Sequence, residues 1–310
     1  MFNNKRILKT GALAAAVTVV FAIFAFRAAE WTKGLDSEFL VYGADTGSTT
    51  GTNTGTGSAT TVTKVVPQIA AGNYGDIGPA KYATIIEIVN TNSTPITISG
   101  TLYSEGGALS TLIGTTNLSS LPTFPGNFSN LSLAGNSVLL IEFGTNSVNT
   151  PVSATTNWGK FVANGTMSVA TFFELRDSVT NVLYSRVGVP ASRADMTSFV
   201  IPRIRQASSG TGIADIDTGF ALVNTSSTPV NVTATVKDAS GNAVGTQQVI
   251  SLAANAHMSG FVTGLFGLTG ETTARQYQYV VFQSNSPSIA AAALAFEGAS
   301  QTSFPVDVLQ

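Results

Sequence analysis

Residues 84–98 read TIIEIVNTNSTPITI, and residues 218–232 read TGFALVNTSSTPVNV. Asn90 and Pro95 of the first stretch stand 134 positions before Asn224 and Pro229 of the second. Further matches flank these stretches in the same order: upstream Val66-Pro67-Gln68-Ile69 with Ile201-Pro202-Arg203-Ile204, and downstream Ser132-Leu133-Ala134 with Ser251-Leu252-Ala253. Matches that recur in the same order along a chain are typical of an internal repeat. The sequence therefore predicts one structural unit that occurs twice.

The two copies differ in length. The offset falls from 134 to 119 residues in the downstream matches, so the first copy carries 15 extra residues between Glu105 and Asn130. Connections between strands tolerate growth, because lengthening a loop adds little to its closure entropy. The extra residues therefore predict a long loop at one end of the first copy.

Both copies alternate between apolar and polar residues, as in VNVTATVK at residues 230–237. This period of two buries one face of a strand and leaves the other to solvent. Asp238-Ala239-Ser240-Gly241-Asn242 predicts a tight hairpin turn, with Gly241 at positive φ. GFVTGLFG at residues 260–267 predicts one helical turn between strands. Seven or eight short strands in each copy predict an all-β fold: two tandem antiparallel Ig-like β-sandwich domains from an internal duplication.

These motifs also resemble those of a known family. The second copy runs through FALVNTSSTPVNVTATVKDASGNAVG (residues 220–245), HMSGFVTGLFG (257–267) and SFPVDV (303–308). It is similar to exported bacterial proteins with tandem Ig-like β-sandwich repeats, and FFELRDSVTNVLYSRVGVPAS (172–192) resembles the strand that joins their two repeats. The likeness covers roughly residues 62–310 and implies fold and export but no chemistry. One departure is that Thr91 and Thr225 stand where that family often has proline.

The N-terminal residues predict export. Lys5, Arg6 and Lys9 precede Gly11–Phe26, which is uncharged and largely apolar. That stretch is shorter than the about 20 residues that cross a bilayer, so it favours a secretory signal; an uncleaved anchor is the alternative. The expected organisation is a signal peptide or membrane anchor at 1–30, a Gly/Ser/Thr-rich spacer at 31–61, and β-sandwich repeats at 62–198 and 199–310. We expect the protein outside the cell or in the cell envelope.

Composition excludes several classes of function. Fifteen basic and 17 acidic residues give a formal charge of −2, so no strong positive field is present to attract nucleic acid or an anionic membrane. The chain has no cysteine, which excludes disulfides, thiolate metal sites and a cysteine nucleophile. We expect no cofactor, and membrane contact only through the N-terminal segment.

Few residues could support catalysis. His257 is the single histidine, and its counterpart at the offset of 119 is Val138, which favours a packing role. Glu87, Glu142 and Glu174 lie in apolar strands, and we expect them at edges or on outward faces, because an unpaired buried carboxylate is costly. Asp215 and Asp217 offer too few oxygen ligands for calcium, and pairing with Arg203 and Arg205 explains them equally well. We expect no catalytic and no metal site.

A candidate binding loop lies in the insertion. LPTFPGNF at residues 121–128 supplies Leu121, Phe124 and Phe128, and Trp158 could join them in an exposed aromatic platform. The alternative is that these rings fold over their own sandwich.

The leading hypothesis is a non-enzymatic structural or adhesive surface module whose partners are surface glycans or proteins. A carbohydrate-binding module is one alternative. Another is an extracellular filament subunit that binds sister subunits, with a segment such as Glu38–Tyr42 completing a neighbour's sheet. An enzyme is the least favoured class.

Overall fold

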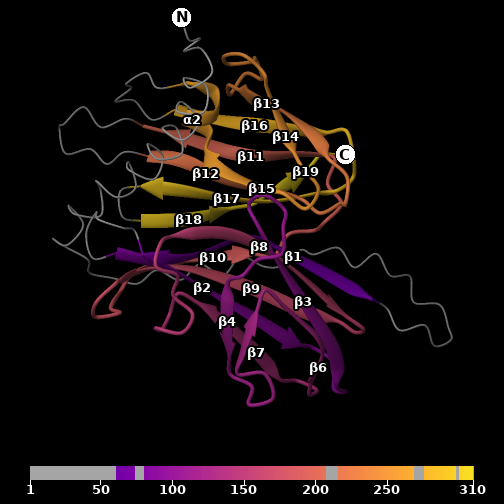
Figure 1. The fold of residues 1–310 in the computed structure, drawn as a ribbon. Coiled ribbons are helices and arrows are strands. Elements are labelled where there is room, and N and C mark those ends of the chain that lie inside the picture. The colour runs from indigo at the N-terminus through magenta and orange to yellow at the C-terminus, as the bar shows by residue number, and fades with distance from the viewer. Residues whose placement is uncertain (1–60, 74–79, 207–215, 269–275, 298–299, 310) are drawn as a thin grey trace, which may run out of the picture.

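The computed structural model describes residues 61–73, 80–206, 216–268, 276–297 and 300–309. These residues are almost entirely β-strand, and every strand pair is antiparallel (Figure 1). The helical turn predicted at 260–267 is α2 (Val262–Phe266), which ends at Gly267 in the left-handed conformation. The all-β prediction is confirmed for the described residues, whereas the proposed signal and residues 31–60 of the spacer lie outside them.

The first unit has two layers around one core. One layer has the order β1-β8-β3-β6, and the other has the order β5-β4-β7-β2-β9-β10. β1 joins them, because its last two residues pair with β2 while the rest pairs with β8. The strands are β1 (Val62–Asn73), β2 (Ala80–Asn90), β3 (Ile96–Ser104), β4 (Ile113–Thr116), β5 (Thr123–Pro125), β6 (Asn127–Leu133), β7 (Val138–Phe143), β8 (Thr155–Ala163), β9 (Met167–Asp177) and β10 (Leu183–Pro190).

The second unit repeats this arrangement. Its layers have the orders β19-β11-β16-β13-β14 and β15-β12-β17-β18. Its strands are β11 (Ser198–Arg205), β12 (Ile216–Asn224), β13 (Val230–Lys237), β14 (Gln248–Leu252), β15 (His257–Phe261), β16 (Gln276–Ser284), β17 (Ile289–Glu297), β18 (Ser300–Phe304) and β19 (Asp307–Val308).

The strand orders of the two units match. β1-β8-β3-β6 corresponds to β11-β16-β13-β14, and β7-β2-β9-β10 corresponds to β15-β12-β17-β18. Among the described strands, β4 and β5 have no counterpart in the second unit, and both lie in the predicted insertion. The insertion therefore lengthens one layer beyond β7, through the pairing of β4 with β7.

Each unit has its own apolar core. In the first, Ile86, Ile141 and Val169 of one layer face Ile98 and Phe161 of the other. In the second, the strand predicted by the alternation at 230–237 is β13, whose four apolar residues are all at most 3% exposed. The alternation therefore identified the inward face correctly.

The hydrogen bonds of the asparagine in the repeated motif explain why both copies carry this residue. Asn90 is fully buried, and its Nδ2 donates to the carbonyl oxygens of Thr94 (2.9 Å) and Ala134 (2.9 Å). Asn224 does the same with Thr228 (2.7 Å) and Ala253 (2.8 Å). Each side chain thus ties the turn after β2 or β12 to the turn between β6 and β7 or between β14 and β15. A buried amide with all its bonds made resists replacement, because any substitute leaves carbonyls unpaired.

The hairpin turn after β13 forms as expected. Asp238 Oδ1 accepts hydrogen bonds from the backbone N–H groups of Ser240 and Asn242, both at 2.9 Å, and Gly241 has φ +84°. Positive φ is strained for residues with a Cβ, so the glycine is required by the turn.

Candidate functional site

The aromatic residues of the insertion do not form an exposed platform. Phe124 is 2% exposed and Phe128 8% exposed; their rings meet edge to face at 5.0 Å, and Leu121 packs against the same core. They reach the core because β4 and β5 extend the layer and because glycines face the rings. A Cβ on Gly114 would lie 2.6 Å from Phe124, and one on Gly100 would lie 2.5 Å from Phe128. The loop aromatics thus cover their own sandwich.

Trp158 is also buried, but at the contact between the two units. Its side chain is fully inaccessible, it stacks on Tyr103 with ring centroids 4.5 Å apart, and its indole N–H donates to the Asn255 carbonyl at 2.8 Å. Asn255 lies in the turn between β14 and β15 of the second unit. Trp158 therefore joins the units and is not available to a sugar.

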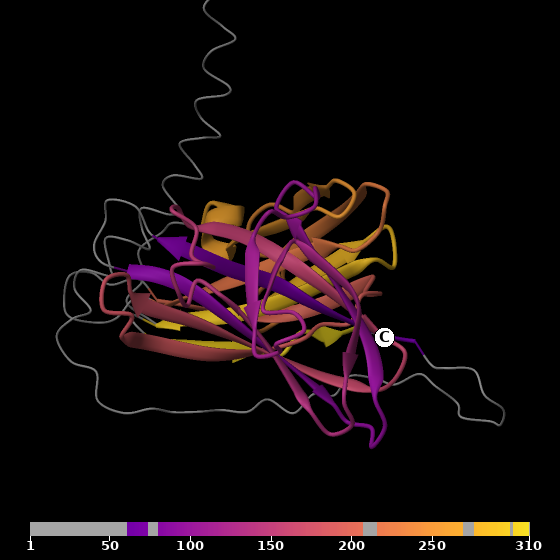
Figure 2. The ribbon, with the colours of Figure 1, turned by 60° about the horizontal axis from the view of Figure 1, so that its bottom comes forward.

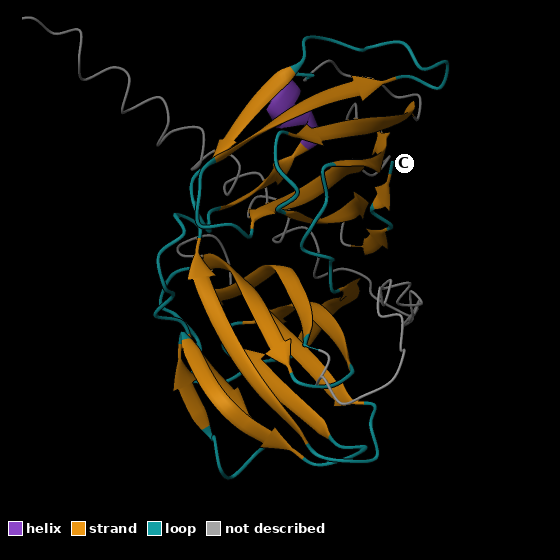
Figure 3. Cartoon of the chain, turned by 90° about the vertical axis from the view of Figure 1, so that its right-hand side faces the viewer, coloured by secondary structure: helices purple, strands orange, loops and turns teal. Residues whose placement is uncertain are grey.

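The contact between the units includes two apolar clusters. The layer β15-β12-β17-β18 lies on the side of the second unit that is toward the first unit (Figure 1). Figure 3 shows the two units one above the other, and in Figure 2 the first unit lies in front of the second. Val223 and Ala290 pack against Val65 and Trp158. A second cluster joins the units through Ala70, Phe173, Val187, Val189 and Ala292. The alanine-rich strand β17 brings the two backbones close, because small side chains need little space.

His257 lies at this contact. It is 3% exposed on β15, its backbone N–H donates to the Glu105 carbonyl at 2.9 Å, and its Nε2 lies 2.6 Å from Gln68 Oε1. Burial lowers the pKa of His257 to about 3, so the ring is neutral and Nε2–H donates to the amide oxygen. Nδ1 has no hydrogen-bond partner among the described residues. The predicted packing role, at an edge strand, agrees with this position.

A β-bulge turns Gln68 toward His257. The register between β1 and β8 shifts between Val66 and Ile69, whereas β11 pairs with β16 without a shift. Arg203, which matches Gln68 in the repeat, consequently points into its own sandwich and is 2% exposed. A bulge adds one residue to a strand and re-aims the side chains around it. The same motif therefore makes an internal contact in one unit and an inter-unit contact in the other.

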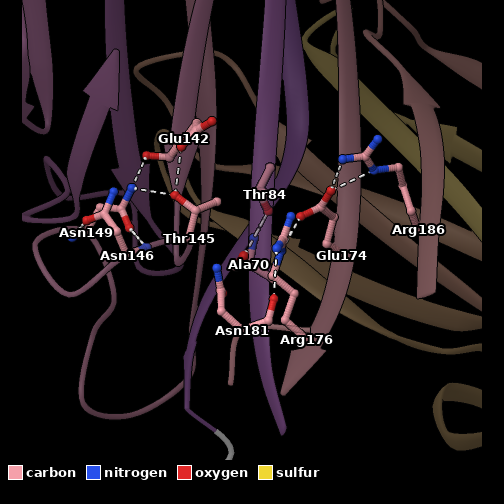
Figure 4. Close-up of polar contacts among 10 residues, drawn as sticks. All are labelled: Ala70, Thr84, Glu142, Thr145, Asn146, Asn149, Glu174, Arg176, Asn181 and Arg186. Carbon is pink, nitrogen blue, oxygen red and sulfur yellow. Dashed lines mark hydrogen bonds and ion pairs between the residues drawn. The ribbon is translucent and has the colours of Figure 1, made fainter. Parts of the chain in front are cut away.

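Glu174 lies on the outward side of its layer, as predicted, but it is not exposed to solvent. On β9, between β2 and β10, it shares the side of Ala170 and Phe172, yet it is 1% exposed. Arg176 Nε donates to its Oε2 at 2.5 Å, and Arg186 Nε donates to its Oε1 at 2.6 Å (Figure 4). The Arg186 guanidinium also lies over the Phe172 ring, 5.6 Å from its centre. The carboxylate tolerates burial because both oxygens are paired with guanidinium groups.

Glu142 and Asn149 belong to a separate network on the same layer (Figure 4). Glu142 is partly exposed, as expected, and its Oε2 accepts from Thr145 Oγ1 at 2.8 Å. Asn149 is 1% exposed and donates to the Glu142 carbonyl at 2.9 Å and to Thr115 Oγ1 at 2.8 Å. These bonds fix the loop after β7 against β4. Glu87 is partly exposed on β2, also as expected.

The aspartate pair is structural where it is described. Asp215 lies outside the described residues, and Asp217 Oδ1 accepts from Thr263 Oγ1 at 2.8 Å. Arg203 Nη2 donates to the same hydroxyl at 3.1 Å. Burial raises the pKa of the Asp217 carboxyl. Within the described ranges, no group of three or more His, Cys, Asp and Glu side chains could hold a metal ion.

A groove of about 410 Å³ lies beside the insertion. Its rim carries three exposed aliphatic side chains: Leu109 (60%), Ile113 (39%) and Val148 (58%). Its floor includes Ser110 and Asn157, joined by a 2.7 Å hydrogen bond from Ser110 Oγ to Asn157 Oδ1. None of its lining residues is charged. No sequence pattern indicated this groove, because its residues come from two separate segments of the chain, 104–113 and 148–157.

Comparisons with known proteins add little. No protein-family model and no curated protein matches the chain. Among solved structures, the chain is similar to one described as "Biofilm associated protein - BSP domain", with 10% identity and a TM-score of 0.21, over 80% of this chain and 59% of that one. A likeness at this TM-score carries no argument about function. In the described part of the chain, no helix has the length and apolar character needed to span a membrane.

Proposed function

We propose that this chain is an exported, non-enzymatic surface protein, whose two Ig-like sandwiches arose by duplication and act together as one rigid structural or adhesive body. The observation that carries the proposal is the contact between the units. This contact buries Trp158, His257 and two apolar clusters, which separate domains would expose. Large apolar contacts of this kind oppose relative motion of domains. Rigidity suits a protein that bears load or displays a surface.

The export half of the proposal rests on the N-terminal sequence. Intact cells treated with protease should lose the chain, and mass spectrometry of the mature N-terminus should show whether residues 1–30 are retained. A chain that fractionates with the cytoplasm and resists protease in intact cells would contradict the proposal.

The structural half is tested by function in cells. Deleting the gene should reduce attachment or mechanical cohesion of the cells, and a chain with the Trp158→Ala substitution should restore it less well than the wild type. Unchanged attachment and cohesion after deletion would contradict a structural or adhesive role.

A second candidate function is carbohydrate binding, at the groove and not at the predicted aromatic residues. An uncharged lining with hydroxyl and amide groups below an aliphatic rim suits a neutral, polar ligand. Leu109→Asp should abolish binding on a glycan array, whereas Val179→Asp, which alters an 84% exposed valine outside the groove, should not. Equal binding by both variants and the wild type would place the ligand elsewhere.

A further inference from the structure

The contact between the units joins two different faces. One is the outer face of β1, β8 and β3, which presents Val65, Trp158 and Tyr103. We call it the first docking face, because it belongs to the first unit. The other is the outer face of β12 and β17, which presents Val223 and Ala290; we call it the second receiving face. Because the strand orders of the two units match, each of these faces has an equivalent in the other unit.

The second unit carries an equivalent docking face. Trp158 stands opposite Tyr103 in the ladder of β8 and β3, and Tyr279 stands opposite Lys237 in the ladder of β16 and β13. Tyr103 and Lys237 are 134 residues apart, which is the offset of the repeat. The second docking face therefore consists of Val200, Pro202, Lys237, Tyr277 and Tyr279.

This second docking face is accessible and largely apolar. Val200, Pro202 and Tyr279 are partly exposed, and Tyr277 is 62% exposed. Val65, the equivalent of Val200, and Trp158, the equivalent of Tyr279, are fully buried in the first unit. The layer that carries the face lies on the far side of the second unit from the first (Figure 1). Exposed apolar faces of this kind mark interaction sites.

The first unit carries the matching receiving face. Val89 and Ser168 stand opposite each other in the ladder of β2 and β9, as Val223 and Ala290 do in β12 and β17. Ala170 and Phe172 follow Ser168 on the same side of β9, and all four are partly exposed. Glu87 lies two residues before Val89 on that side. The first receiving face therefore consists of Glu87, Val89, Ser168, Ala170 and Phe172.

We propose that the second docking face binds the first receiving face of another copy of this chain, head to tail. In the contact within the chain, Tyr103 packs against the cluster that Val65 and Trp158 form with Val223 and Ala290. The same docking between copies brings Lys237 against Val89 and Ser168, beside Glu87. A lysine thus meets a glutamate across the interface, and the remaining residues supply the apolar area.

The proposed contact is heterologous, because two different surfaces meet. Such contacts continue from copy to copy and form a filament, or a ring if the rotation closes. Another copy of the chain is thus the partner in the proposed structural role. The contact between copies does not depend on export, since purified protein is enough to test it.

Charge reversal gives a sharp test with the purified full-length chain. The wild type should form species larger than a monomer in sedimentation velocity, and each of Lys237→Glu and Glu87→Lys should weaken association at least about 100-fold. An equimolar mixture of the two variants should associate again, because each face then meets an opposite charge. Assembly by each single variant equal to that of the wild type would overturn the proposal, as would a wild type that is monomeric at every concentration.

Two further variants make the outcome independent of misfolding. Tyr277→Ser changes a mostly exposed ring and should weaken association without changing the circular dichroism spectrum. Ser132→Glu adds a charge at an exposed position of β6, outside both faces, and should leave association unchanged. If Tyr277→Ser associates like the wild type while Ser132→Glu does not, the interface lies elsewhere and the proposal fails. A cytoplasmic location with intact assembly would contradict the proposed export alone.

Discussion

Glu174 is a buried carboxylate held by two guanidinium groups that reach solvent, with side-chain exposures of 17% for Arg176 and 37% for Arg186. Replacing it by glutamine keeps the volume but removes the charge that both arginines pair with. We expect Glu174→Gln to lower the free energy of unfolding by about 1–3 kcal/mol, less than a fully buried pair would lose, because both arginines can hydrate. Glu87→Gln on the neighbouring strand is the matched control and should cost less than about 0.5 kcal/mol at a dilution where the chain is monomeric. Urea denaturation measures both, and equal losses would show that the pairing is not stabilising.

His257 makes stability depend on pH. Its pKa is about 3 in the folded chain and near 6.5 when unfolded, so the unfolded chain binds more protons between these values. Stability is therefore complete above pH 6.5 and falls with decreasing pH, by up to about 1.4 kcal/mol for each pH unit. His257→Val, which copies Val138 of the first unit, should lack this dependence between pH 7 and 5, where few carboxylates titrate. Parallel urea midpoints for the two chains across that range would contradict a neutral, buried ring.

At the scale of elements, the insertion is part of the core. Phe124 on β5 packs on Phe143 of β7 and Phe128 of β6, so truncating it leaves a cavity between two layers. We expect Phe124→Ala to lower the free energy of unfolding by about 3–5 kcal/mol. Leu109→Ala lies in the same insertion at an exposed position and should cost less than about 0.5 kcal/mol. A small effect of Phe124→Ala would mean that β4 and β5 fold independently of the core.

The elements that were predictable from sequence are those set by local patterns. Alternation defined β13, the Asp238 turn followed from its aspartate and glycine, and GFVTGLFG defined α2. The candidate site was not predictable in this way, because it depends on contacts between distant residues. Trp158 meets Asn255, 97 positions away, and Gln68 meets His257, 189 positions away. A local motif does not distinguish an aromatic ring on the surface from one that is buried between two units.

The bulge in β1 shows how a local irregularity has a distant effect. Val66-Pro67-Gln68 and Ile201-Pro202-Arg203 match in sequence, and only the first has a register shift. Pro67 lies in β1, at the edge of its layer, and Pro202 lies in β11, which has only the short strand β19 beyond it. At such positions a missing backbone N–H costs little. The sequence match could not show that one copy turns its polar side chain outward. Asymmetry between matching units is therefore where the inter-unit contact is made.

At the scale of the whole molecule, Trp158 determines how firmly the two units are joined. Trp158→Ala removes a fully buried ring, its stack on Tyr103 and its bond to Asn255, while the apolar core of each unit is left intact. We therefore expect the strand content in circular dichroism to stay the same and the radius of gyration in small-angle X-ray scattering to rise. The matched control is Tyr279→Ala, at the equivalent position of the second unit but outside the contact between units, measured at a dilution where the chain is monomeric. A radius of gyration that rises in the control and not in Trp158→Ala would show that the units are held together elsewhere, and the rigid-body proposal would lose its main support.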